Sequence, residues 1–145
     1  DNNTSNNKTF VKHLAEDCKS NQVYKGILND RSKATYFSKT HVDQLAQKTE
    51  GYQLSKGILL SDNASYFSKP ELKIYADDVK CSHGSTIGPI DENAIFYLRS
   101  RGMSKIAATK ILISSFINEE LSSIDNQQMS EIIQKKLVRY LSKVK

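Results

Sequence analysis

The sequence predicts a mainly β fold with a helical subdomain at its C-terminal end. Residues 9–90 hold short runs of alternating apolar and polar residues between polar turns, a pattern typical of strands. Residues 91–145 instead carry apolar residues at helical spacing. The strand-like part also contains an internal repeat with a period near 30 residues. These three observations favour the C-terminal coils of a right-handed parallel β-helix, followed by helices.

The internal repeat has two blocks. Residues 33–39 (KATYFSK) match residues 63–69 (NASYFSK) at an offset of 30, and residues 25–28 match residues 56–59, both KGIL, at an offset of 31. The one-residue difference falls in the turn between the blocks, where an insertion costs little. We therefore expect the matching segments to stack in adjacent coils of one sheet. The alternative is an antiparallel sandwich in which the repeat is accidental.

The first eight residues are expected to lie outside the ordered strand region. Residues 1–8 (DNNTSNNK) are polar and low in complexity, which indicates a disordered edge, so the β-helix core is assigned to residues 9–90. The chain has no initiating methionine and no visible signal peptide, and any targeting segment is expected upstream. It also holds no run of about 18 apolar residues, so a transmembrane helix is not expected.

Three helices are expected in the helical subdomain, residues 91–145. Asp91 is a good N-cap, and Gly102 is suited to the position just after the helix that it starts. Ser104 is expected to cap a second helix that ends near residue 118 and is apolar nearly all round, which predicts a buried helix. Asp125 is a candidate cap for the third, whose apolar residues form one clear stripe.

Charge and cysteine content exclude several classes of function. The net charge is +5 and the pI about 9.1, but basic residues are spread over both parts of the chain. No basic and aromatic interleaving on one face is evident, so neither nucleic acid nor a membrane is expected as a partner. The two cysteines do not make a disulfide framework and are expected to be reduced thiols.

An adjacent acidic pair marks a corner. The alternating pattern falls on even-numbered positions in residues 72–76 and on odd-numbered positions in residues 79–83. A break in the strand at Asp77-Asp78 would explain why the buried face changes from one set to the other. Neighbouring residues on a strand point to opposite faces, so Asp77 and Asp78 are not a catalytic dyad. The pattern G-x-x-x-x-G-K-[ST] is absent, so ATP binding by that route is excluded.

Cys81 and His83 are the residues with chemical potential. Two apart on a strand, they face the same side with Cα atoms roughly 6–7 Å apart, which is too far for a direct thiolate–imidazole hydrogen bond. Both could reach one metal ion or a small cluster, because thiolate and imidazole are good iron ligands. Two ligands do not complete a site, so the others must come from a partner chain. His13 and His41 are expected on the surface, and Cys18 is expected to be structural.

The segment around these residues resembles a known family. Residues 75–84 read YADDVKCSHG, Gly88 follows, and residues 96–102 read FYLRSRG. This order is similar to the SufB/SufD family of the SUF iron–sulfur cluster assembly system. The resemblance is sharpest from residue 69 to 102 and good from 24 to 68. FYLRSRG favours the SufD branch, and a SufB-type subunit is the close alternative.

The resemblance implies a non-enzymatic scaffold subunit that pairs with SufB and docks the ATPase SufC through its C-terminal helices. It implies that His83 faces SufB and helps to build a nascent iron–sulfur cluster, with Cys81 as an auxiliary candidate ligand. That cluster is transient and shared with SufB, and this fragment alone is expected to hold none. A homodimer in isolation is the alternative pairing.

Localisation and the rival function follow from the same comparison. The family and the asparagine- and lysine-rich composition favour a plastid-type organelle, an apicoplast or chloroplast stroma, with bacterial cytoplasm as the alternative. A carbohydrate-active enzyme on a β-helix is the rival function. It requires a groove with several exposed carboxylates, and the sequence offers only Asp77 and Asp78.

Overall fold

The computed structural model describes residues 2–142 and is mixed α/β. The chain divides into two compact units, a strand unit that ends at Pro89 and a helical unit that begins at Ile90, and each is described by itself. The strands are β1 (Thr4–His13), β2 (Lys19–Leu28), β3 (Lys33–Val42), β4 (Thr49–Leu59), β5 (Ser65–Ile74) and β6 (Val79–Pro89). The helices are α1 (Glu92–Ser100), α2 (Lys105–Leu121) and α3 (Gln127–Leu141).

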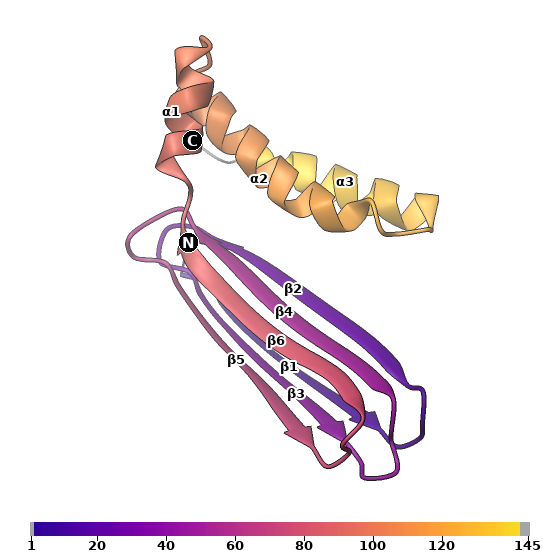
Figure 1. The fold of residues 1–145 in the computed structure, drawn as a ribbon. Coiled ribbons are helices and arrows are strands. Elements are labelled where there is room, and N and C mark those ends of the chain that lie inside the picture. The colour runs from indigo at the N-terminus through magenta and orange to yellow at the C-terminus, as the bar shows by residue number, and fades with distance from the viewer. Residues whose placement is uncertain (1, 143–145) are drawn as a thin grey trace. The chain divides into compact units, whose positions relative to one another are not determined.

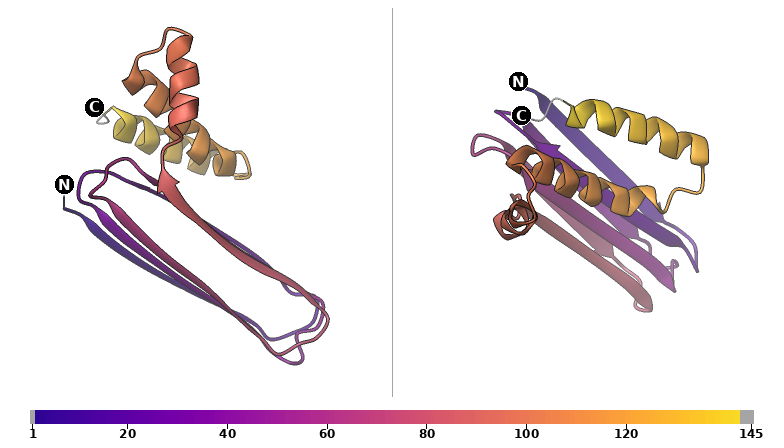
Figure 2. Two further views of the ribbon diagram at one scale, coloured as in Figure 1. Left: turned by 60° about the vertical axis from the view of Figure 1, so that its left-hand side comes forward. Right: turned by 90° about the horizontal axis from the view of Figure 1, so that it is seen from above.

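The strand unit consists of two three-stranded parallel sheets (Figure 1). One has the order β1-β3-β5 and the other β2-β4-β6, so successive strands alternate between the sheets. The sheets form two layers joined by loops at both ends, as Figure 2 shows edge-on. Alternate residues of each strand therefore point either into the space between the layers or out to solvent.

The predicted parallel strands and following helices are present, but the β-helix itself is not confirmed. The six strands stand as two separate sheets of three, and within residues 2–142 they do not establish a solenoid. The antiparallel alternative is wrong, because every strand pair in both sheets is parallel.

The internal repeat corresponds to strand pairing. The two KGIL segments are paired residue for residue across β2 and β4, from Lys25 with Lys56 to Leu28 with Leu59. The other two matching segments also lie on neighbouring strands, β3 and β5, but Ala34 pairs with Tyr66. Their structural offset is therefore 32 rather than 30 residues. A shift of two keeps the side-chain parity, so the interior face is the same in both strands.

The space between the sheets is apolar at both ends and polar in the middle. One apolar cluster contains Leu28, Ala34, Tyr36, Ala64 and Tyr66, and the other contains Val42, Ala46 and Ala76. In the middle, the hydroxyl of Thr40 accepts hydrogen bonds from Gln22 Nε2 at 3.0 Å and Gln53 Nε2 at 2.6 Å. Because Thr40 and Gln53 belong to different sheets, these bonds tie the two layers together.

Two expectations for the N-terminal region are wrong. Residues 4–8, expected to be a disordered edge, form the first half of β1, because their backbone pairs with β3. His13, expected on the surface, is only 4% exposed at the end of β1. Its Nε2 lies 2.8 Å from the Ser20 hydroxyl, which supplies the hydrogen bond that a buried imidazole needs.

The first two helices of the helical unit have the caps that the sequence predicts. The carboxylate of Asp91 accepts from the backbone N–H groups of Asn93 and Ala94, and Gly102 has a φ of +91° just beyond α1. The hydroxyl of Ser104 caps α2 by accepting from the N–H of Ala107. These caps satisfy backbone donors that the first turn leaves unpaired.

The rest of the helical unit departs from expectation in three details. The second helix extends to Leu121 rather than to about residue 118, and the third is capped by Asn126 rather than Asp125. The second helix is not buried all round, since Ile106 and Ile111 are each 46% exposed while Ile113 is fully buried. No helix among the described residues is long and apolar enough to cross a membrane.

A matched pair of glycines tests the packing of the strand unit. A Cβ added at Gly57 would clash with the ring of Tyr66, lying 2.9 Å from Cε1, and that ring is held by a 2.6 Å hydrogen bond to Ser55. Gly57→Ala should lower the free energy of unfolding by about 1–3 kcal/mol. At Gly26, its partner in register, the nearest atoms are 3.4 Å or more away. Gly26→Ala should therefore change stability by no more than about 1 kcal/mol. Urea unfolding measures both, and equal losses would contradict this packing.

Burial of His13 predicts loss of stability in acid. Burial lowers its pKa below the ordinary value near 6.5. The unfolded chain then binds a proton that the folded chain does not, so stability is full above pH 6.5 and falls as pH drops through that value toward the folded pKa. The slope from one such group is at most about 1.4 kcal/mol per pH unit.

Urea unfolding across this pH range should show a smaller acid-side loss in His13→Gln than in the unaltered chain. His41→Gln is the matched control and should keep the loss, because His13 is still present. An unchanged pH dependence in His13→Gln would refute the assignment.

Candidate functional site

The candidate site lies on β6, an edge strand of its sheet in the described part of the chain. Cys81 and His83 share one face of this strand, as their spacing predicts, and that face is the one directed toward the other sheet. In register on β4, Cys81 lies beside Gly51 and His83 beside Gln53. The site therefore combines two potential ligands with a strand edge that has no partner strand among residues 2–142.

Cys81 is half-buried and belongs to the edge of an apolar cluster. Its side chain packs against the group formed by Val42, Ala46 and Ala76. A Cβ at Gly51 would lie 3.2 Å from the sulfur, so glycine at that position leaves room for the thiol. Burial raises the pKa of the Cys81 thiol, and a hydrogen bond from the Gly51 backbone lowers it by a smaller amount. The net effect keeps more of the thiol protonated than in water.

His83 is exposed but stands next to a buried, polar side chain. Gln53 is 3% exposed, and its Nε2 donates to Thr40 while its Oε1 has no hydrogen-bond partner within the described residues. Gln53 and His83 are paired in register and share a face. The unpaired Oε1 of Gln53 is thus a hydrogen-bond acceptor on the same face as the imidazole of His83.

Cys81 and His83 do not form a complete metal site by themselves. Residues 2–142 contain no group of three or more His, Cys, Asp or Glu side chains placed to hold a metal ion. The other residues weighed as ligands lie elsewhere: His13 is buried at the end of β1, His41 is half-exposed on β3 with Nε2 4.0 Å from Asp43, and Cys18 is a free, half-exposed thiol before β2.

The acidic pair forms the predicted corner. Asp77 and Asp78 are exposed in the bend between β5 and β6. The backbone of Asp78 is held at that bend, where its N–H donates to Gln47 Oε1 at 2.9 Å and its carbonyl accepts from the N–H of Lys48 at 2.6 Å. Their backbone role supports a structural assignment.

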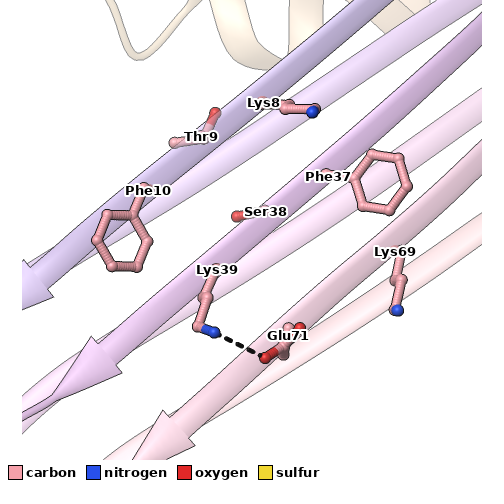
Figure 3. Close-up of a pocket in the computed structure, with 8 residues that line it drawn as sticks. All are labelled: Lys8, Thr9, Phe10, Phe37, Ser38, Lys39, Lys69 and Glu71. Carbon is pink, nitrogen blue, oxygen red and sulfur yellow. Dashed lines mark ion pairs between the residues drawn. The ribbon is translucent and has the colours of Figure 1, made fainter.

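One surface feature was missed by sequence reasoning. Figure 3 shows Phe10 and Phe37 beside Lys8, Lys39 and Lys69 on the outer face of the sheet β1-β3-β5. The expectation that no basic and aromatic interleaving exists on one face is therefore wrong. Each strand shows the alternation of outward-facing residues in its own sequence. That the lysine and phenylalanine side chains of three strands lie together depends on the register of those strands, which the sequence alone does not give.

Comparison with known proteins decides the family. A family model described as "SUF system FeS cluster assembly, SufBD core domain" matches residues 1–116. The chain belongs to the SufBD family. It is 37% identical over 130 residues to the "Iron-sulfur cluster assembly protein SufD" of Escherichia coli (strain K12), covering 90% of this chain and 31% of that protein.

Two further relatives of this SufBD family protein come from eukaryotes. "Protein ABCI7, chloroplastic" of Arabidopsis thaliana is 37% identical over 113 residues, covering 77% of this chain and 24% of that protein. The "Iron-sulfur cluster assembly protein SufD" of Plasmodium falciparum (isolate 3D7) is 31% identical over 134 residues, covering 92% of this chain and 9% of that protein. The chain thus spans about a third or less of these three relatives, of which two are named SufD and one is named chloroplastic.

Proposed function

We propose that the chain is part of a non-enzymatic, SufD-type scaffold subunit that pairs with SufB and docks the ATPase SufC during iron–sulfur cluster assembly. The naming of the relatives as assembly proteins supports the scaffold role. In this proposal the two sheets are the end of a longer β-helix, and the protein works in a plastid-type organelle or, alternatively, in bacterial cytoplasm.

One observation carries the proposal: Cys81 and His83 share a face of an edge strand. The unpaired backbone groups of β6 are a template for a strand from another chain, a common mode of recognition. A partner strand added there would bring its own side chains next to Cys81 and His83. SufB is the proposed source of that strand and of the remaining ligands.

The chemistry suits a nascent cluster as cargo rather than a resident cofactor. A thiolate and an imidazole are both suitable iron ligands, but two of them bind weakly without further groups. Cys81 must lose its proton to bind iron, and its raised pKa opposes this until metal is present. Gln53 Oε1 offers an acceptor for one ring N–H of His83, which would leave the other ring nitrogen free for iron.

Substitution of His83 tests the ligand role. His83→Ala, made in the complete protein together with SufB and SufC, should change stability by less than about 0.5 kcal/mol because the side chain is exposed. Iron and acid-labile sulfide in the anaerobically reconstituted complex should fall sharply. Cys81→Ser should cause a smaller loss if the thiol is auxiliary.

Ser82→Ala is the matched control, because Ser82 is also exposed on β6 but points to the opposite face. It should load as much iron and sulfide as the unaltered complex. If His83→Ala loads equally well, the histidine has no ligand role and this part of the proposal fails. Co-purification with SufB, measured on the same samples, separates loss of a ligand from loss of pairing.

The helical unit is the proposed docking site for SufC. Large apolar side chains are exposed on it, among them Phe96 and Tyr97 of α1, at 72% and 57% exposure, and Val138 of α3. The guanidinium of Arg101 lies 5.3 Å from the Tyr97 ring and donates to its hydroxyl, so Tyr97 is held in an outward position. Exposed aromatic side chains of this kind are the usual anchors of protein interfaces.

Phe96→Asp should therefore reduce SufC pull-down by at least tenfold, since an interface anchor contributes about 2 kcal/mol or more, while leaving SufB pairing intact. Asn93→Asp is the matched control, because it adds the same charge to an exposed position of the same helix. Pull-down that is equally strong for both variants and for the unaltered protein would rule out docking through this surface of α1.

A further inference from the structure

The outer face of the sheet β1-β3-β5 carries an organised set of lysine and phenylalanine side chains. We call it the lysine–phenylalanine face and define it by Phe10, Phe37, Phe67, Lys8, Lys39 and Lys69. Lys8, Phe37 and Lys69 are aligned in one row across the three strands, and Phe10 and Lys39 are aligned in the next. Phe67 is aligned with Thr35 and so lies in the row on the opposite side of the Phe37 row from Phe10.

This register places the aromatic rings on a diagonal. Each strand contributes one ring, and the Phe37 and Phe67 ring centroids are 5.9 Å apart. The exposed fractions are 57% for Phe10, 37% for Phe37 and 56% for Phe67. A shallow hollow of about 360 Å³ lies between Phe10, Phe37 and the neighbouring lysines (Figure 3). Planar groups could therefore stack on successive rings along the diagonal.

The charge of this face is strongly positive. Glu71 is the one acidic residue among the outward-facing positions of β1, β3 and β5. It is held by Lys39 at 3.1 Å, and this contact keeps the pKa of the Glu71 carboxyl below its ordinary value. Lys8 and Lys69 lie on either side of Phe37 in the same row, so positive charges stand next to the aromatic ring.

We propose that the lysine–phenylalanine face binds single-stranded nucleic acid. Such polymers are bound by aromatic side chains on which bases stack, flanked by cations that follow the phosphates. An open sheet with one exposed ring per strand meets that requirement. The proposal does not depend on the cluster-assembly role, because it uses other residues on the other sheet.

A protein partner fits this face less well. Lysine is depleted at protein interfaces, and this face is rich in it. All its large apolar groups are aromatic, and none is aliphatic. The outer face of β2-β4-β6 gives the contrast, since it also carries lysines but its apolar residues are mainly aliphatic, such as Val23 and Leu54.

Fluorescence anisotropy with a labelled oligouridylate of about 16 nucleotides, the upper end of the site size of one single-strand-binding fold, tests the proposal. Binding should weaken as salt rises from about 50 to 200 mM. Phe37→Ala and Phe67→Ala should each weaken binding by roughly 5- to 150-fold, the equivalent of about 1–3 kcal/mol for one stacked base. Lys8→Glu and Lys69→Glu should weaken binding and flatten its salt dependence.

Val23→Ala and Lys80→Glu, on the outer face of the other sheet, are the matched controls and should leave binding unchanged. Circular dichroism melting verifies that each variant folds. No binding at low salt would overturn the proposal, as would equal losses from variants of both sheets. Competition by polyglutamate or duplex DNA as strong as by unlabelled oligouridylate would also overturn it, because the face would then recognise charge alone.

Discussion

Parallel pairing between strands that are about 30 residues apart is the constraint on which the strand unit depends. Paired residues are 29 apart for β1 and β3, 32 for β3 and β5, 31 for β2 and β4, and 30 for β4 and β6. Parallel neighbours need a crossover connection of a dozen residues or more. Here each crossover is itself a strand of the opposite sheet, so pairing in one sheet forces the second layer to form.

Local sequence was sufficient for the helix caps and for the shared face of the two candidate ligands, because these depend on spacing along one helix or strand. The caps at Asp91 and Ser104, the corner after β5, and the shared face of Cys81 and His83 all follow from residues close in sequence. What surrounds the site does not. The room that Gly51 leaves for the thiol depends on pairing between distant strands.

The failures have the same physical origin. His13 looks like a surface histidine in its polar segment, but the start of β2 supplies Ser20 as a hydrogen-bond partner and makes burial tolerable. Residues 4–8 are too polar to indicate a strand, yet the backbone of β3 pairs with them whatever their side chains. The sequence repeat did not reveal the offset of 32 between β3 and β5, because the offset with the most identical residues differs by two from the offset of the hydrogen-bonded register.

Because side chains alternate between the two faces of a strand, each strand sequence contains two separate sets of residues, one for the interior and one for the outer surface. On β3, Tyr36 belongs to the interior, and the next residue, Phe37, belongs to the outer surface. Substitutions in one set do not alter the other, so the residues of the outer surface can change while the interior packing stays the same. A single-residue deletion within the strand would exchange the two sets. We therefore expect insertions and deletions to be tolerated better in the turns than within a strand, and substitutions at outward-facing positions to leave the interior packing unchanged.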